Sequence, residues 1–355
     1  MNMFIQKNPY DTSKIKLNNI HELIKQRNFN QHNPFNINYS TYYGIEYALK
    51  EFIGFPKDYE IKAFFDHGIT FTSALEAAFR IHESLPTITC SEFRKNIILS
   101  KKNNGVYSIG PYIAYAKSLL NKSELKEEKN KIGKNILVFP LHSTNKTQYD
   151  YSLKNFTNEI LKFSDDFDSI TVCLFWKDVE KGLDKYYKNL NFNVVTAGYT
   201  TDPMFLKRLR SIIELSDMTI SNGIGSHTGY CIYLKKPHIY IPTKTNLVIK
   251  KADNEPNIKD KLTRYLENQY EIKTNHNDLE NIKKILSDEN RDLNKIPPIL
   301  DKYYGFNQVK TKKELKKIVE NLEDEFSRLK FYLTLPKLFK YYLEVYYKAY
   351  EYKIQ

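Results

Sequence analysis

The stretch Asp217-Met-Thr-Ile-Ser-Asn-Gly-Ile-Gly-Ser-His-Thr-Gly229 joins a short apolar strand to a glycine-rich turn and the start of a helix. Small residues let the backbone approach a ligand, and the free N–H groups and dipole at the start of a helix favour an anion. We therefore predict a phosphate-binding turn made by Asn222, Gly223, Gly225, Ser226, His227 and Thr228. The alternative is a tight turn that needs glycine for its geometry alone.

Two familiar phosphate motifs do not describe this turn. It lacks the GK[ST] of a Walker A loop, and it follows the fourth strand pattern of its region, whereas the Rossmann GxGxxG fingerprint follows the first.

Outward from this turn, strand and helix patterns alternate. Apolar strand patterns cover residues 135–140, 169–176, 192–196, 217–221 and 238–242, and helical patterns cover 149–163, 179–190, 203–215 and the segment up to Leu234. This alternation predicts a parallel, doubly wound sheet. Ligands of such sheets bind at the carboxyl ends of the strands, where the strand order reverses.

A second α/β unit precedes this region. We predict helices over 41–53, 73–82 and 111–120 and strands over 60–65, 87–90 and 105–109. The charged segment 121–131 marks a domain boundary. The chain is therefore predicted to be an α/β protein with two Rossmann-like domains, over 1–125 and 134–310, and closing helices at 312–330 and 337–353 within a segment 311–355.

Composition excludes several classes of protein. The three cysteines lie far apart in apolar runs, which predicts buried free thiols rather than disulfides or a zinc site. The net charge is +12, from 54 Lys+Arg against 42 Asp+Glu, but the basic residues are dispersed, so we expect no nucleic-acid partner. No apolar run is long enough to cross a membrane and the start lacks a secretory pattern, so we expect an intracellular protein.

A second polar loop follows the first strand of the doubly wound region. It contains His142, Ser143, Thr144, Asn145 and Lys146. The first and fourth strands of such a sheet are neighbours, so this loop and the glycine-rich turn should meet at one crevice. Lys146 or Ser143 would contact a diphosphate there, and His142 would orient it or titrate, unless it only caps or packs.

A third loop, Gly198 to Asp202, lies beside the same crevice and is assigned to the donor side of the site. Asp202-Pro203 is typical of a helix N-cap followed by proline at the first helical position. Phe205 lies on the apolar face of the helix, and we expect Lys207, Arg208 and Arg210 to be solvated, unless one reaches a phosphate.

In the first domain, Asp66-His67-Gly68 ends a strand. A general base belongs on such a loop, and either Asp66 or His67 can take a proton from an attacking hydroxyl. Alternatively, Asp66 caps the next helix and His67 has no role. Asp166-Phe-Asp168 has metal-binding spacing but precedes a strand, at the wrong edge of the sheet, so we expect a solvated turn and no metal site.

The run from Leu215-Ser-Asp to Leu234-Lys-Lys-Pro-His238 resembles the donor-side segment of GT-B glycosyltransferases of bacterial capsule and lipopolysaccharide biosynthesis. Asp66-His-Gly with Ser108-Ile-Gly-Pro-Tyr-Ile-Ala-Tyr115 is similar to their acceptor-side domain, and 303–315 to their C-terminal region. The resemblance extends from about residue 60 onward. It implies two domains around a deep cleft, with a closing C-terminal helix.

The resemblance also implies a reaction. A sugar would pass from a nucleotide-sugar donor to a hydroxyl of a glycan or lipid-linked glycan. The retaining pattern of two glutamates eight positions apart is absent between Asn135 and Lys250, which favours inversion. Neither a cofactor nor a metal is expected. The rival hypotheses are a CDP-polyol phosphotransferase of teichoic-acid-like polymers, a sugar-nucleotide epimerase, and a non-catalytic binding module.

The aromatic and basic residues of the segment 337–353 leave two readings open. They suit contact with the cytoplasmic face of the inner membrane, but we favour the alternative, a closing helix packed on the first domain.

Overall fold

The computed structural model describes residues 11–27, 42–71, 86–100, 105–142, 147–249, 275–289, 292 and 295–333. The helices predicted at 73–82 and 337–353, and the site residues Ser143, Thr144, Asn145 and Lys146, lie outside the described residues.

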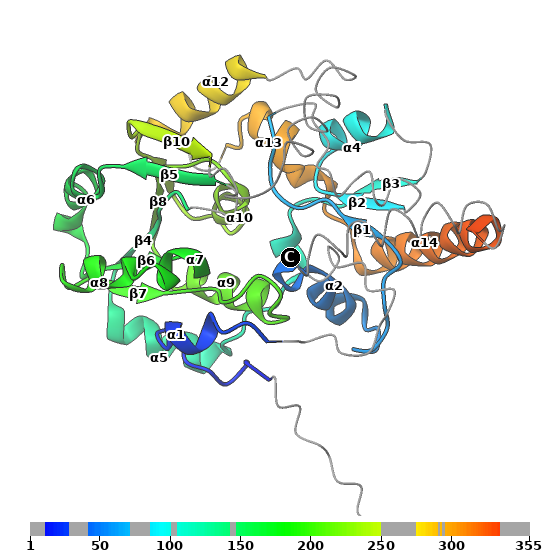
Figure 1. The fold of residues 1–355 in the computed structure, drawn as a ribbon, viewed down its shortest axis with the longest axis horizontal. Helices are drawn as coiled ribbons and strands as arrows, with labels where there is room; N and C mark the ends of the chain where they lie inside the picture. Colours follow the sequence, from blue (N-terminus) through cyan, green and yellow to red (C-terminus); the bar gives the residue numbers. More distant parts are fainter. Residues whose placement is uncertain are drawn as a thin grey trace, which may run out of the picture.

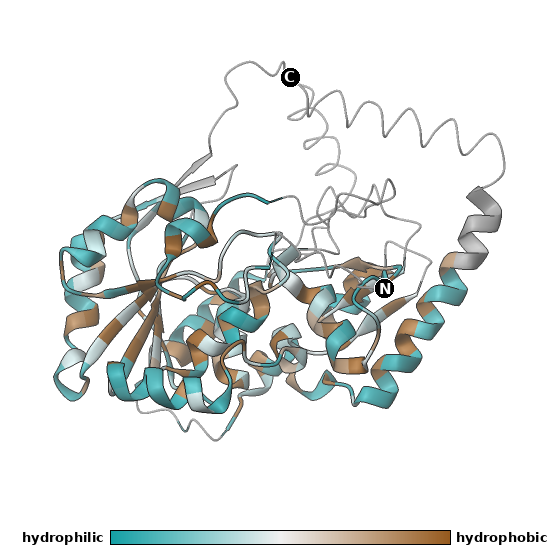
Figure 2. Ribbon diagram, turned by 90° about the horizontal axis from the view of Figure 1, so that it is seen from below, coloured by the Kyte–Doolittle hydropathy of each residue, from teal (hydrophilic) through white to brown (hydrophobic). Residues whose placement is uncertain are grey.

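The C-terminal half is built on a five-stranded parallel sheet (Figure 1). Its strands are β4 (Asn135–Phe139), β6 (Ser169–Cys173), β7 (Asn193–Val195), β8 (Met218–Ser221) and β9 (His238–Tyr240), in the order β7-β6-β4-β8-β9. This is the predicted doubly wound order, with β4 beside β8. Helices α6 (Leu153–Leu161), α7 (Trp176–Glu180), α8 (Leu183–Lys188), α9 (Phe205–Glu214) and α10 (Ser226–Tyr233) connect the strands. Figure 2 shows the apolar strands between the more polar helices.

The N-terminal half has a smaller parallel sheet in the order β1-β2-β3. Its strands are β1 (Phe64–Phe65), β2 (Thr87–Thr89) and β3 (Val106–Ser108). The 3-10 helix η1 (Tyr42–Gly44) and α2 (Ile45–Ile53) precede β1, α4 (Glu92–Leu99) follows β2, and η2 (Tyr112–Tyr115) follows β3. The predicted strands are present but shorter. Of the helix predicted over 111–120, only residues 112–115 are helical, as the 3-10 helix η2.

The charged segment 121–131, which we predict as a domain boundary, forms the helix α5 (Lys122–Ile132). It begins with a capping box between Asn121 and Glu124 and buries no residue. One further prediction was wrong. Residues 149–151, predicted as helix, belong to β5 (Thr147–Tyr151). That strand pairs antiparallel with β10 (Thr245–Ile249), a partner about one hundred residues away that local periodicity does not reveal.

The C-terminal segment returns to the N-terminal half. Helices α12 (His276–Ser287) and α13 (Pro298–Tyr304) and the 3-10 helix η4 (Phe306–Gln308) lead to α14 (Lys312–Leu333). Helix α14 packs against α2, as Figure 1 shows. Leu315, Val319 and Leu322 share one apolar cluster with residues of α2, and Tyr59 donates a hydrogen bond to Glu323 at 2.8 Å.

The N-terminal segment crosses the other way. Residues 11–27, with α1 (Ile20–Leu23), lie on the C-terminal half, where Tyr199 N donates to Leu23 O at 3.1 Å. Each half of the molecule therefore includes a segment from the opposite end of the chain.

The basic residues of α9, predicted to be solvated, are in fact bonded. Arg208 is fully buried and pairs with Asp202 at 3.2 Å. Arg210 donates to Ala116 O at 2.9 Å, and Lys207 pairs with Glu51 of α2 at 3.0 Å. Helix α9 faces the N-terminal half, so its polar side meets protein instead of water.

Apolar packing continues from one half to the other. One cluster includes Ile45 and Leu49 of α2, Phe139 of β4 and Leu209 of α9. As predicted, Cys90, Cys173 and Cys231 are free and buried. Burial raises the pKa of each of these thiols to about 12, so they are inert at neutral pH.

We expect Arg208→Ala to lower the free energy of unfolding by about 3–5 kcal/mol, because it leaves Asp202 charged, buried and unpaired. Urea denaturation measures this loss. Arg210→Ala is the matched control on the same helix, where the guanidinium is partly exposed and the loss should be clearly smaller. Equal losses for the two variants would contradict the role assigned to the buried pair.

Candidate functional site

The loops that follow β4 and β8 meet, as predicted. Leu141 N donates to the Asn222 side-chain oxygen at 2.7 Å, just beyond the paired residues Phe139 and Ser221. A Cβ atom at Gly223 would lie 2.7 Å from the Leu141 side chain. Glycine at position 223 therefore serves the close approach of the two loops.

Asn222 joins three segments at this edge of the sheet. Its oxygen accepts from Leu141, and its amide nitrogen donates to Thr243 Oγ1, 3.2 Å away, beyond β9. The side chain is buried. Its amide group therefore holds the two loops and the segment after β9 together.

The first turn of α10 is held from behind by Tyr304. The Tyr304 hydroxyl donates to Gly225 O at 3.1 Å, and a Cβ atom at Gly229 would lie 2.1 Å from the Tyr304 ring. Thr228 is buried, and its hydroxyl accepts from Gly225 N at 3.4 Å. Within the described residues, the side chain of Ser226 and the backbone N–H groups of Ser226 and His227 make no hydrogen bond. These groups can face an anion.

His227 is neutral at physiological pH. Its ring stacks on Phe139 with centroids 5.0 Å apart, and its Nε2 is buried with no hydrogen-bond partner among the described residues. Burial, reinforced by the nearby His142, lowers the pKa of His227 to about 3, although a hydrogen bond to the backbone of Gly223 opposes this. His227 can therefore hydrogen-bond a ligand but brings no positive charge. His142 stacks on Phe175, with ring centroids 4.3 Å apart.

Gly198 and Asp202, both predicted on the donor side of the site, instead surround the buried Arg208 side chain. Asp202 Oδ1 accepts from Thr12 Oγ1 and from Met204 N, both at 2.8 Å, and Oδ2 faces Arg208. Gly198 has φ +103°, and a Cβ atom there would lie 2.8 Å from the Arg208 guanidinium. Because Asp202 is only 1% exposed, its carboxylate stabilises the start of α9 rather than facing the crevice.

The two candidate bases differ in environment. Asp66 is 4% exposed; its Oδ2 accepts from Arg94 Nε at 3.0 Å and from Thr89 Oγ1 at 2.8 Å, and its Oδ1 from Arg94 Nη2 at 3.3 Å. His67 is half-buried and contacts the rings of Tyr42 and Tyr43. Of the two, His67 is the one that a substrate can reach.

The loop that contains Asp66 and His67 is linked to α10 through η2. Tyr112 of η2 donates to Asp66 O at 2.7 Å, and η2 packs against α10. Three residues that no site prediction included take part in these contacts: Arg94 pairs with Asp66, Tyr43 contacts His67 and Tyr304 supports the first turn of α10. No motif marks these residues, since each partner comes from a distant part of the chain.

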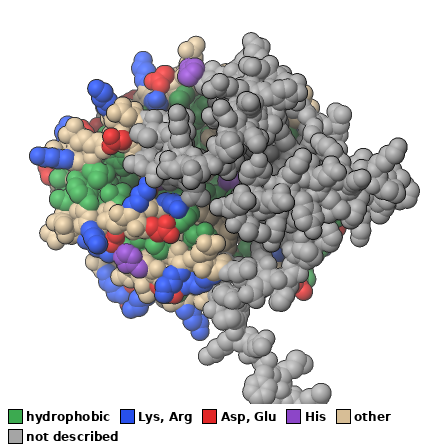
Figure 3. All heavy atoms as spheres, in the orientation of Figure 1, with side chains coloured by type: hydrophobic (Ala, Val, Ile, Leu, Met, Phe, Trp, Pro, Cys, Tyr) green, Lys and Arg blue, Asp and Glu red, His purple; other side chains and the backbone are tan. Residues whose placement is uncertain are grey.

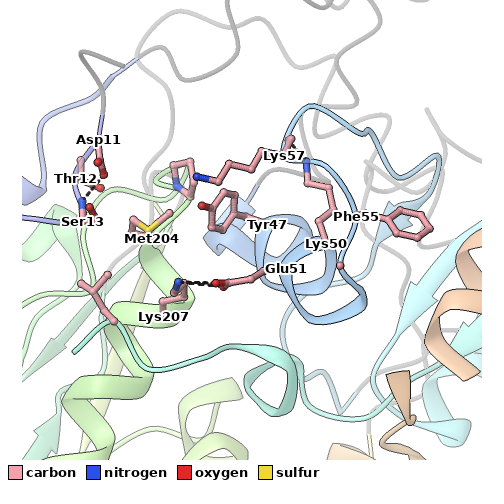
Figure 4. A pocket seen from close by; sticks show the side chains of 13 residues that line it. Asp11, Thr12, Ser13, Tyr47, Lys50, Glu51, Phe55, Lys57, Met204 and Lys207 are labelled. Carbon is pink, nitrogen blue, oxygen red and sulfur yellow. Dashed lines mark hydrogen bonds and ion pairs between the residues drawn. The ribbon is translucent and has the colours of Figure 1, made fainter. Parts of the chain in front are cut away.

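A cavity of about 730 Å³ lies between α2 and the start of α9 (Figure 4). It is lined from the N-terminal half by residues such as Tyr47 and Glu51, and from the C-terminal half by Met204 and Lys207. Lys207 pairs with Glu51, and Lys50 donates to two backbone carbonyls. The predicted donor residues do not line this cavity.

Charges on the surface are interspersed. On the face shown in Figure 3, Lys and Arg alternate with Asp and Glu across the described part. Asp166 and Asp168 are exposed, and Asp168 accepts from Lys134 N at 2.7 Å before β6, as expected of a solvated turn.

Among the residues that the structure describes, no three His, Cys, Asp or Glu side chains gather as metal ligands would, and no helix has the length and hydropathy to cross a membrane.

Comparisons with known proteins found little. No family model and no curated protein matches the chain. Among solved structures, the wall teichoic acid polymerase TagF is similar, with 16% identity and a TM-score of 0.38, and a histidine-to-alanine variant of TagF has a TM-score of 0.34. Each alignment covers 68% of this chain and 58% of the TagF chain. The function proposed below therefore rests on the geometry of the site.

The state of His227 predicts a dependence of stability on pH. Its pKa is about 3 in the folded protein against 6.5 in the unfolded chain, so the unfolded chain binds a proton first as the pH falls. Stability is thus lost progressively below pH 6.5. Between pH 7 and pH 5, the free energy of unfolding should fall by about 2 kcal/mol less in His227→Gln than in the unsubstituted protein. Urea denaturation at both pH values measures this difference. An unchanged pH dependence would contradict a neutral, buried His227.

Variants at the two candidate bases should differ in their free energy of unfolding. Asp66→Ala leaves Arg94 buried without its partner, so we expect a loss of about 3–5 kcal/mol in the free energy of unfolding. His67→Ala removes a half-buried ring and should lose about 1 kcal/mol or less. Urea denaturation of both variants tests this, and the reverse order would refute the assignment of Asp66 to structure.

Proposed function

We propose that this protein is an inverting, metal-independent glycosyltransferase of the GT-B type. It would transfer a sugar from a nucleotide-sugar to a hydroxyl of a capsule or lipooligosaccharide glycan. The observation that carries the proposal is the meeting of the β4 and β8 loops at the carboxyl edge of a doubly wound sheet, with free N–H groups at the start of α10. Such an edge is where α/β proteins bind phosphorylated ligands.

In the proposed reaction, the leaving phosphate lies on the first turn of α10. The N–H groups of Ser226 and His227 and the hydroxyl of Ser226 stabilise its growing negative charge. The neutral His227 contributes a hydrogen bond without charge. Ser143 and Lys146, in the loop after β4, are proposed as further contacts to the phosphates.

His67 is the proposed general base. It takes the proton of the acceptor hydroxyl while that oxygen attacks the anomeric carbon. The bond from the anomeric carbon to the phosphate oxygen breaks, and its electron pair leaves with the phosphate. A direct displacement of this kind inverts the anomeric centre. The Asp66–Arg94 pair keeps the end of β1 in place beside His67.

We also propose that the enzyme works at the cytoplasmic face of the inner membrane. A lipid-linked glycan would present its acceptor hydroxyl there. The support is the sequence of the segment 337–353, which contains aromatic residues together with several lysines.

Thermal unfolding with CMP, CDP, UDP and GDP tests the donor site. One nucleotide should stabilise the protein, by about 2.7 kcal/mol at one hundred times its Kd, and EDTA should not reduce the effect. Gly225→Val should abolish this stabilisation, because a Cβ at residue 225 lies 3.1 Å from the His227 ring and crowds the turn. Gly182→Asn, before α8 in the same domain, is the control that should retain it, because asparagine tolerates the left-handed backbone of that position.

No stabilisation by any nucleotide would refute the donor site. A hit that EDTA removes would refute metal independence. With CDP-glycerol as the donor, a product that keeps the phosphate on the acceptor would show a polyol phosphotransferase instead.

A further inference from the structure

Tyr43 has a backbone conformation that a bulky residue rarely adopts. Its φ is +59° and its ψ is +17°, in the left-handed region. Two other non-glycine residues among those described share a positive φ. One is Asn191, a residue type that tolerates this region, and the other is Lys235, where α10 ends. Tyr43 instead precedes a helix, so neither explanation applies, and strain of this kind gathers at functional positions.

The C-terminal half holds Tyr43 in this conformation. Tyr43 N donates to Thr200 O at 2.6 Å, across the boundary between the halves. The next residue, Gly44, is also left-handed, and a Cβ atom there would lie 2.4 Å from Pro203 O. The loop 200–203 therefore clamps residues 43 and 44, and only glycine fits at residue 44.

This conformation places the Tyr43 ring between two others. Its centroid lies 5.3 Å from that of His67 and 5.0 Å from that of Phe205 of α9. Tyr42 meets the same imidazole edge-on, with centroids 5.5 Å apart. His67 thus lies against two tyrosine rings, and one of them, that of Tyr43, also contacts the C-terminal half through Phe205.

Hydrogen bonding does not orient His67. Among the described residues, its polar contact is from Nδ1 to Phe65 O at 3.5 Å, too long for a well-formed hydrogen bond. The tyrosine rings are therefore the groups that limit the rotation of the imidazole.

We propose that Tyr43 is a positioning residue for His67, and that it makes the orientation of this base depend on the donor-side half of the molecule. The proposal rests on the proposed function for its catalytic meaning. Loop 200–203 fixes the backbone conformation of Tyr43, and the Tyr43 ring fixes the orientation of the His67 imidazole. His67 therefore faces the acceptor only when the two halves are packed together as in this structure. In this proposal Tyr43 acts through His67.

NMR of the full chain with labelled histidines tests the contact directly. The resonance of His67, assigned by its loss in His67→Gln, should carry a ring-current shift from Tyr43. Tyr43→Gly should move it towards the position of a solvated histidine, while Tyr43→Phe should keep it in place. Tyr47→Ala, one turn further along α2 in the cavity of Figure 4, is the matched control and should not move it.

Two comparisons separate positioning from folding. Tyr43→Gly should melt at a higher temperature than Tyr43→Ala, because glycine adopts a left-handed backbone without strain. The substrate for the kinetic test is a nucleotide-sugar that carries the nucleotide found to stabilise the protein. Both variants should lower kcat for release of that nucleotide by about tenfold or more, with KM for the donor unchanged.

The outcomes distinguish the two proposals. An unmoved His67 resonance in Tyr43→Gly, or wild-type kcat in that variant, overturns the positioning role and leaves the proposed function standing. Wild-type transfer by His67→Gln overturns the proposed base, whatever the NMR shows for Tyr43.

Discussion

The buried ion pair between Arg208 and Asp202 is the interaction on which most of the site depends. Two charges that are almost completely removed from water need partners, and Thr12 and backbone carbonyls supply hydrogen bonds to the pair. The pair determines the course of the loop between β7 and α9, which in turn contacts Tyr43 and Gly44 of the other half. A charge pair in one half thus determines where a tyrosine ring of the other half lies.

The boundary between the halves is a packed interface. Helix α9 contributes apolar residues to a cluster that contains α2, and its lysine and arginine residues bind groups of the N-terminal half. The chain ends reinforce this, since residues 11–27 lie on the C-terminal half and α14 on the N-terminal half. Relative motion of the halves must therefore preserve or break a defined set of contacts at α9.

At the proposed donor site, the described groups at the start of α10 that would face a phosphate are neutral. Burial holds His227 uncharged, and the basic residues of α9 are committed to carboxylates and carbonyls. An anion at the start of α10 would be stabilised mainly by backbone N–H groups, which are oriented in advance by Tyr304 behind the turn and Asn222 beside it. Such dipoles need no counter-ion and little reorganisation when charge develops.

The sequence by itself determined the strand order of the larger sheet, the meeting of the β4 and β8 loops, the buried thiols and the exposed turn at Asp166. These follow from hydrophobic periodicity and from the rules of parallel sheets, which are local or topological. Only the tertiary structure decided that Asp202 and Gly198 support a buried arginine, that Asp66 is occupied by Arg94, and that residues 149–151 form a strand. Each of these depends on a partner distant in the chain, and whether a charged or polar side chain faces water, a ligand or another residue is decided by what packs against it.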